Sequence, residues 1–163
     1  MGCDKAGLRL GSRTLLGHIR VAAQSLGLRP RIIRRDLVQR CGPLAGVYTG
    51  LKTSVAKAEM FLACDMPFIS AGLLERLLDA WAADHRAGFI VSGRRAGFPF
   101  LVPVRALPIV QQQIRTKRYS LQKLAEVLKA RLIRPPGRME RGLFNANTPA
   151  DLKKARQLWK AGV

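Results

Sequence analysis

The sequence is poor in acidic residues, cysteines and aromatic residues, and it lacks any long apolar run. Only 10 of the 163 residues are acidic, against 29 basic ones, so the formal net charge is +19. The three cysteines, Cys3, Cys41 and Cys64, are widely spaced, which excludes a disulfide framework and the paired spacing of a zinc site. No apolar run approaches the ~20 residues of a membrane span, and the charged N-terminus lacks the apolar stretch of a secretory signal. The sequence therefore predicts a cytoplasmic protein.

The positive charge is dispersed along the chain. It occurs in short stretches such as RPRIIRR, RTKR and RPPGRMER, and aromatic residues make up only 6% of the chain. A charge of this size indicates an anionic partner or a highly solvated surface. Because few aromatic side chains are present to stack on bases, the pattern favours a solvated surface or a phosphate-rich small substrate over a specific nucleic acid.

Apolar spacing predicts strands that alternate with helices. The predicted helices cover 15–26, a segment marked by Val47, Leu51 and Val55, a segment after Ser70, 106–115, 120–131 and the C-terminal stretch that Thr148 begins. The predicted strands cover 31–34, 60–63, 88–93, 98–104 and 131–135, with 98–104 at an edge because prolines bound it. This alternation predicts one α/β domain over 1–163, with helices on the faces of a mostly parallel sheet.

The stretch FLACDMPFIS places a carboxylate directly after a short apolar segment. Phe61, Leu62 and Ala63 indicate a strand that is covered on both faces, and Pro67 ends it. Ligands of open α/β sheets bind beyond the carboxyl ends of the strands, so Asp65 would stand at a ligand or metal site. The alternative is a turn residue that bonds only to its own backbone.

Three further loops carry candidate polar groups at the same predicted edge of the sheet. In CGPLAGVYTG, Gly42 and Gly46 precede or begin a helix, as close approach of backbone to an anion requires, although simple turn chemistry has the same pattern. In FNANTPADL, Asn145 and Asn147 precede a helix with a capping box, and they serve either a ligand or the bracing of the loop. The third loop, GCDKAGL, carries a lysine near the start of the chain.

Taken in order, the segments MGCDKA, IIRRD, GPLAGVYTGL, ACDMPF, PFLVPV and NANTPADL resemble the molybdenum cofactor guanylyltransferase family of MobA-like NTP transferases over almost the whole chain. The resemblance implies a Rossmann-like, three-layer fold of the nucleotide-diphospho-sugar-transferase type. It also implies transfer of GMP from GTP to molybdopterin-bound molybdenum, with release of pyrophosphate.

The resemblance also assigns roles to single residues. Lys5 and Asp65 are implied as catalytic residues, with Lys5 near the phosphates and Asp65 as the ligand of Mg²⁺. Asn145 and Asn147 are implied near the acceptor. The residues implied to bind the nucleotide are Lys5, Asp36, Gly42, Pro43, Leu44 and Asp65.

The implied chemistry agrees with the residues present. Attack of an acceptor phosphate on an α-phosphorus joins two polyanions, so catalysis depends on neutralising charge and on positioning. The acceptor phosphate is already a nucleophile, which explains why the sequence needs no activated serine, cysteine or histidine. The implied partners are GTP and molybdenum-molybdopterin, with room for contacts to a molybdoenzyme or a cofactor carrier, and no membrane.

The sequence departs from the family pattern at its start. Family members begin with a strand and a glycine-rich phosphate loop, and this chain begins at the Met-Gly that follows that loop. The expectation is a start assigned too late, and weak activity for the chain as given. The expected consequence is that RIIR pairs directly with MFLAC, or that both present unpaired strand edges.

Two other functions fit the same sequence less well. One is a cytidylyltransferase or another small-molecule nucleotidyltransferase of this fold; cytidylyl relatives usually carry aspartates where this chain has Asn145 and Asn147. The other is a non-enzymatic protein that binds polyanions through its charge. Binding to arbitrary DNA with a steep salt dependence, and no response to nucleotide with magnesium, would identify the latter.

Overall fold

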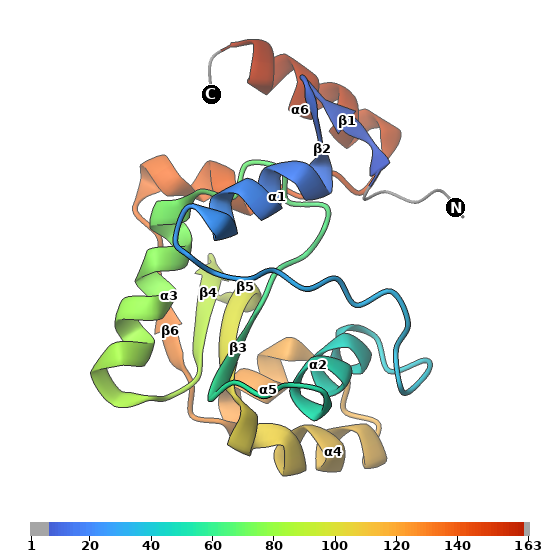
Figure 1. Ribbon diagram of the computed structural model, residues 1–163, viewed down its shortest axis with the longest axis vertical. Coiled ribbons are helices and arrows are strands. Elements are labelled where there is room, and N and C mark those ends of the chain that lie inside the picture. Colours follow the sequence, from blue (N-terminus) through green and yellow to red (C-terminus); the bar gives the residue numbers. More distant parts are fainter. Residues whose placement is uncertain (1–6, 162–163) are drawn as a thin grey trace. The chain divides into compact units, whose positions relative to one another are not determined.

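The computed structural model describes residues 7–161, which fall into two compact units (Figure 1). In the described chain, unit 1 comprises 7–30, 62–75 and 135–161, and unit 2 comprises 31–61 and 76–134. Lys5 and Cys3 lie outside the described residues. The assignment of 1–163 to a single domain stays a prediction.

Unit 2 contains a four-stranded sheet. Its strands, in spatial order, are β3 (Ala58–Phe61), β5 (Arg95–Pro103), β4 (Gly88–Ser92) and β6 (Arg131–Ile133). The predicted α/β class is confirmed, and β3, β4 and β6 run in one direction. The β5 strand is antiparallel to both of its neighbours, so only the β4–β6 ladder is parallel and the sheet is mixed, where a mostly parallel one was predicted. The cause is the short turn at residues 93–94, because a connection of that length joins only antiparallel strands.

The predicted edge position of the strand at 98–104 is wrong, because β5 lies between β3 and β4. Prolines are tolerated within a sheet where the ladder is irregular. Pro99 meets that condition: the register shifts between Phe89, which pairs with Phe100, and Ile90, which pairs with Gly97. On its other side, β3 pairs with β5 only as far as Phe100.

Helices cover both faces of this sheet (Figure 1). The helices α2 (Pro43–Lys52), α4 (Leu107–Arg115, after a short 3₁₀ turn Val104–Ala106) and α5 (Leu121–Val127) share one apolar cluster with the sheet. The second half of α3 (Ala71–Asp84) covers the other face, where Leu77 and Ala80 approach Gly88. The three-layer arrangement implied by the sequence is therefore present in unit 2.

Gly50 shows how closely α2 packs on β3. A Cβ atom at Gly50 would lie 2.6 Å from Cε1 of Phe61 and 3.4 Å from Cδ1 of Ile33. Alanine normally stabilises a helix interior relative to glycine. At this position we expect Gly50→Ala to destabilise the protein by about 1–3 kcal/mol, because the Phe61 ring must move. Urea unfolding measures the effect, and a gain in stability would contradict this packing.

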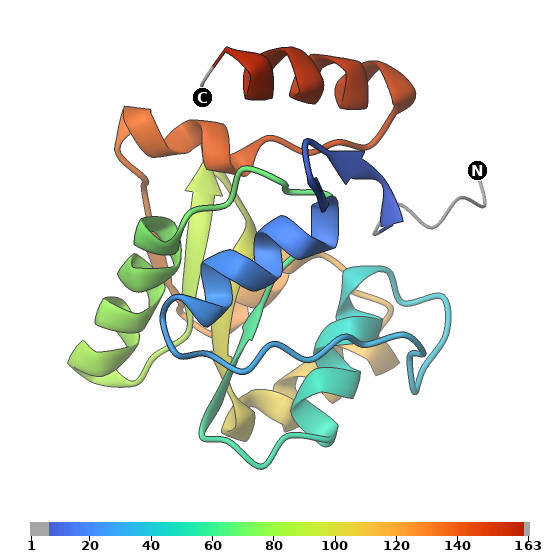
Figure 2. The same ribbon diagram turned by 45° about the horizontal axis from the view of Figure 1, so that its top comes forward.

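Unit 1 contains a short hairpin and two helices. Its elements are β1 (Arg9–Leu10), β2 (Arg13–Thr14), α1 (Leu15–Gln24), the 3₁₀ segment Gly137–Leu143 and α6 (Pro149–Lys160). The β1–β2 hairpin lies beside α6 (Figure 2). Its turn packs on this helix, because a Cβ atom at Gly11 would lie 2.6 Å from Nε1 of Trp159. Leu10, Leu15, Ala146 and Ala155 form the buried cluster of this unit. The hairpin was not predicted, because two-residue strands are too short to show an alternating pattern.

Several predicted boundaries are corrected. The segment 31–34 forms no strand, so the first of the two expected outcomes, the pairing of RIIR with MFLAC, does not occur. Of the second outcome, only the β3 part is found, since β3 is an end strand that pairs with β5 alone among the described strands. Instead, the Arg31 guanidinium donates to the Gly50 carbonyl at 3.0 Å and contacts the Thr53 hydroxyl. The strand predicted at 60–63 lies at 58–61 and is only partly buried until Phe61.

Three helices end earlier than predicted: α1 ends at Gln24, α2 ends at Lys52 and leaves Val55 exposed, and α5 ends at Val127. Among residues 7–161, no helix is long and apolar enough to cross a membrane.

Candidate functional site

Asp65 lies in unit 1, in an irregular segment that begins one residue after β3 ends. Its carbonyl oxygen accepts a hydrogen bond of 2.7 Å from the Ala146 amide. Its side-chain Oδ1 is buried and has no hydrogen-bond partner among residues 7–161. A buried carboxylate oxygen without a hydrogen-bond donor is energetically costly, which leaves this oxygen with free capacity to accept a hydrogen bond or to coordinate a cation.

The segment that contacts Asp65 is the predicted asparagine motif. Ala146 is 2% exposed and belongs to the apolar cluster of unit 1, whereas Asn145 and Asn147 on either side of it are exposed. The buried alanine thus anchors the segment, and the two amide side chains stand at the surface close in sequence to the residue that bonds Asp65. Within unit 1 the structure therefore brings together Asp65 and the asparagine segment, as the sequence predicted.

The helix that follows the asparagines begins as predicted. The Asp151 amide donates to the Thr148 hydroxyl oxygen at 3.1 Å, and the Thr148 amide donates to Asp151 Oδ2 at 2.9 Å, which forms a capping box. The backbone amide of Asn147 donates to the same carboxylate oxygen at 3.2 Å. The cap therefore fixes the backbone of Asn147 as well as the start of α6.

The capping box makes the stability of unit 1 depend on pH. Hydrogen bonds from the Thr148 hydroxyl and amide, and from the Asn147 amide, hold the pKa of Asp151 below its ordinary value. A carboxyl group whose pKa is lower in the folded state than in the unfolded state stabilises the protein at pH values above the unfolded-state pKa. This stabilisation disappears as the pH falls through the folded-state pKa. We expect Asp151→Asn to lower the melting temperature near neutral pH, and the difference to shrink below about pH 4. Circular dichroism melts across this range test it; a difference that does not change with pH would contradict it.

The second predicted group of residues lies in unit 2, at the start of α2. Gly42 is the N-cap residue with a φ of 53°, a left-handed conformation that favours glycine, and Pro43 occupies the first turn. Leu44 is 0% exposed and its side chain belongs to the core. Any contribution of Leu44 to ligand binding therefore comes from its backbone amide, one of those that the first turn of a helix leaves without an intrahelical partner.

Asp36 lies over α2 and not at the end of a strand, because 31–34 is irregular. Its Oδ1 is 3.8 Å from the position that a Cβ atom would take at Gly46. The adjacent Leu37 amide donates to the Thr49 hydroxyl at 2.9 Å, which ties the segment to the helix. Asp36 is exposed, so its carboxylate is accessible beside the first half of α2.

One residue beside this turn was not predicted from the sequence. The Cβ of Tyr119 lies 3.9 Å from the position of a Cβ at Gly42, and Tyr119 is half-buried. It precedes Ser120, whose hydroxyl caps α5. The available signal was a single aromatic residue in the basic stretch RTKRYS, which is too weak to assign a site.

Asp65 is the residue that best fits the implied divalent metal. Its unpartnered Oδ1 is a hard oxygen ligand of the kind Mg²⁺ prefers, and Mg²⁺ needs only one or two carboxylates when phosphate oxygens and water complete its shell. Within residues 7–161, no group of three or more His, Cys, Asp or Glu residues is placed to hold a metal by itself. A metal at Asp65 would therefore be shared with the phosphates of a substrate.

Known proteins resemble the chain in sequence. The family model of the MobA-like NTP transferase domain matches residues 22–132. A probable molybdenum cofactor guanylyltransferase from Opitutus terrae is 29% identical over 96% of this chain and 89% of its own length. A molybdenum cofactor guanylyltransferase from Pseudomonas putida is 34% identical over 69% of this chain, and the match spans 59% of that relative.

Solved structures resemble the chain in fold. Molybdopterin-guanine dinucleotide biosynthesis protein A from Archaeoglobus fulgidus superposes with a TM-score of 0.72 at 19% identity, over 98% of this chain and 92% of the other. The 2-C-methyl-D-erythritol 4-phosphate cytidylyltransferase from Thermus thermophilus superposes with a TM-score of 0.68 at 19% identity, over 94% and 92%. At these identities the structures establish the fold.

Proposed function

The chain belongs to the MobA-like NTP transferase family of nucleotidyltransferases, and we propose that it transfers GMP from GTP to molybdopterin-bound molybdenum. The observation that carries the proposal is the match along 96% of the chain to a relative named a probable molybdenum cofactor guanylyltransferase. The buried, unpartnered Oδ1 of Asp65 supports it, because a carboxylate there would hold the divalent cation that neutralises the phosphates in nucleotidyl transfer.

In the proposed reaction, an oxygen of the terminal acceptor phosphate attacks the α-phosphorus of GTP. The bond between this phosphorus and the oxygen that bridges to the β-phosphorus breaks, and pyrophosphate leaves with the electron pair. The new bond joins GMP to the acceptor through a phosphoanhydride. No proton has to be removed from the nucleophile, so the protein contributes charge and position.

Asp65 would hold Mg²⁺, which when bound neutralises phosphate charge and orients the reacting groups. Asn145 and Asn147 would donate amide hydrogens to the acceptor phosphate, and the capped start of α6 would keep their backbone in place. At the nucleotide, the Gly42-Pro43-Leu44 turn would offer backbone amides, and Asp36 would accept hydrogen bonds from the nucleoside. Lys5 would neutralise phosphate oxygens.

The proposal predicts a preference for GTP. Purified protein is incubated with Mg²⁺, molybdenum-loaded molybdopterin and an equimolar mixture of GTP and CTP, and the dinucleotide products are separated by mass. We expect the guanine product to dominate at least roughly tenfold, a discrimination that a few hydrogen bonds to the base supply. Dominance of the cytosine product would refute the base assignment, and it would identify the alternative of a cytidylyltransferase of the same fold.

The same assay separates an enzyme from a protein that only binds polyanions. A nucleotidyltransferase releases one pyrophosphate for each dinucleotide formed, and it does so only with the acceptor present. Absence of pyrophosphate release, together with salt-sensitive binding to arbitrary DNA, would instead support the non-enzymatic alternative.

A further inference from the structure

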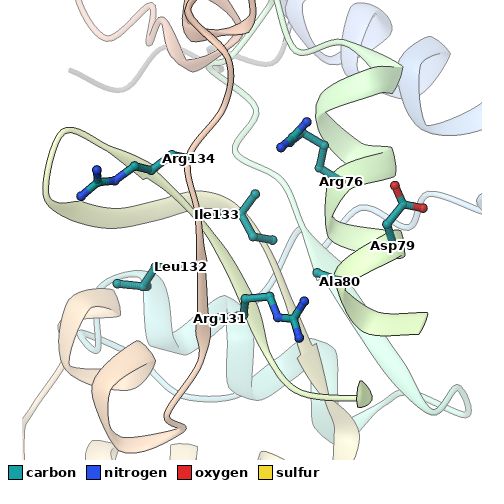
Figure 3. Close-up of a pocket in the computed structure, with 7 residues that line it drawn as sticks. All are labelled: Arg76, Asp79, Ala80, Arg131, Leu132, Ile133 and Arg134. Carbon is teal, nitrogen blue, oxygen red and sulfur yellow. The ribbon is translucent and has the colours of Figure 1, made fainter. Parts of the chain in front are cut away.

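A basic cavity of about 450 Å³ lies in unit 2 between α3 and β6 (Figure 3). The residues that line it are Arg76, Asp79, Ala80, Arg131, Leu132, Ile133 and Arg134. None of them belongs to the candidate site described above. Three arginines against one aspartate give the cavity a positive charge, and the Asp79 carboxylate points away from β6 (Figure 3).

Two of the three arginines are available to a ligand. The Arg131 guanidinium donates to Asp84 Oδ2 at 2.7 Å. Arg76 and Arg134 form no hydrogen bond or ion pair with any residue in the described part of the chain. Arg76 extends from α3 toward β6, and Arg134, the residue after β6, extends to the side away from α3 (Figure 3). A ligand along β6 would therefore meet a free guanidinium on each side of the strand.

The β6 strand is also an edge of the sheet. It pairs with β4 on one side and with no other strand in the described chain. The Arg131 amide donates to the Ala87 carbonyl at 2.8 Å, that is, toward β4. Because backbone groups alternate in direction along a strand, the N–H and C=O of Leu132 point outward from the sheet. Leu132 is 53% exposed.

We propose that β6 accepts an extended, acidic segment of a partner protein as an additional strand. The outward backbone groups of Leu132 would hydrogen-bond the segment, as in other cases of strand addition. Acidic side chains at alternate positions of the segment would face α3, and one of them would pair with Arg76. Apolar side chains between them would cover Leu132, and a flanking acidic residue would reach Arg134.

Charge complementarity selects this occupant over a second copy of the chain. Pairing of two β6 edges would bring the arginines of both copies together, in a protein that already carries a net charge of +19. Charged side chains on an edge strand also prevent such association in natural proteins. An acidic segment would instead form ion pairs with the arginines that would repel a second copy of the chain.

The probe is a fluorescent peptide of about ten residues in which glutamate and valine alternate. Binding is followed by fluorescence anisotropy with the full chain at about 0.15 M salt, where long-range attraction is screened. We expect saturable binding that Arg76→Gln weakens roughly tenfold. Arg94→Gln, which removes one exposed charge of unit 2 outside the cavity, should leave binding unchanged.

Two control peptides separate the proposal from simple attraction of charge. A peptide of the same composition with its glutamates in one block keeps the charge and loses the alternation. A peptide with N-methylated backbone amides keeps the side chains and loses the main-chain donors. Both should bind at least roughly tenfold more weakly, because alternation and main-chain hydrogen bonds define an added strand.

The proposal is overturned if the block peptide binds as well as the alternating one, or if Arg94→Gln weakens binding as much as Arg76→Gln. It is also overturned if inorganic phosphate displaces the alternating peptide at equal concentration, since the cavity is then a site for small anions. Retention of affinity by the N-methylated peptide would exclude addition of a strand.

Discussion

Replacement of Asp65 by asparagine is expected to reduce GMP transfer at least roughly a hundredfold while the protein stays folded. The carboxylate has one buried oxygen without a donor among residues 7–161, and an amide cannot supply the negative charge that a divalent metal requires. The hydrogen bond that ties this segment to Ala146 uses the backbone carbonyl of Asp65, so the substitution does not remove it. A neutral side chain is also less costly to bury than a carboxylate.

The measurement combines activity with a direct test of the metal. Initial rates of product formation are compared with thermal melts, and the shift in melting temperature caused by GTP with Mn²⁺ is recorded for both proteins. We expect Asp65→Asn to melt close to the parent without ligands and to lose most of the shift with them. Glu140→Gln, which removes an exposed carboxylate of the same unit, is the matched control and should behave as the parent. Unchanged turnover of Asp65→Asn would remove the metal role from this residue.

The asparagine segment could be predicted from the sequence because its structure is determined locally. Thr148, Pro149 and Asp151 place a cap, a proline in the first turn and a reciprocal hydrogen bond within four residues, and all of these are present. The contact between Ala146 and Asp65 could not be derived in the same way, because it joins residues far apart in the chain. The alternation of strands and helices placed both segments at one edge of the predicted sheet, and the resemblance to a family added the expectation that they serve one site.

The segment 31–34 shows why a strand is harder to predict than a capped helix. Ile32 and Ile33 give an apolar pair, but a strand exists only where a neighbour accepts its hydrogen bonds. No described strand pairs with it, and Ile32 is 38% exposed while the Arg31 side chain bonds to the end of α2. The apolar pair therefore correctly indicated that part of this segment packs against the protein, but the predicted strand conformation was wrong.

The position of β5 inside the sheet could not be predicted from the spacing of apolar residues and prolines in its sequence. The prolines of PFLVPV favoured an edge, because a proline cannot donate to a ladder. In the structure Pro99 coincides with a shift of register, and Pro103 is the last residue of the strand. The short turn before Arg95 was the better signal, since it forces β5 to lie antiparallel beside β4.

Replacement of Phe100 by alanine is expected to be the most destabilising single substitution in unit 2. Phe100 is 0% exposed and lies opposite both Phe61 and Phe89 in the two ladders of β5. Its ring stacks on Phe89 at 4.6 Å between centroids and on Phe61 at 5.2 Å. Loss of a buried phenylalanine costs about 3–5 kcal/mol, a large part of the roughly 5–15 kcal/mol that stabilises a typical domain.

Urea unfolding provides the test, with Phe100→Leu as the control that keeps most of the apolar volume. We expect the leucine variant to lose less than about 1.5 kcal/mol, and the alanine variant at least twice as much, with a lower midpoint and an unchanged slope. Losses of less than about 1.5 kcal/mol in both variants would show that the side chain at position 100 contributes little, and that the stacked rings of Phe61, Phe89 and Phe100 do not stabilise the sheet.

The two tryptophans allow the effect to be assigned to a unit. Trp81 belongs to unit 2 and Trp159 to unit 1, and the chain has no others. In variants that keep one tryptophan each, Phe100→Ala should shift the transition reported by Trp81. Coincident shifts of both probes would show that the units unfold as one cooperative system, as two-state behaviour requires. A shift at Trp81 alone would show that the stacked rings of Phe61, Phe89 and Phe100 stabilise unit 2 independently of unit 1. A shift at Trp159 alone would contradict the assignment of Phe100 to the core of unit 2.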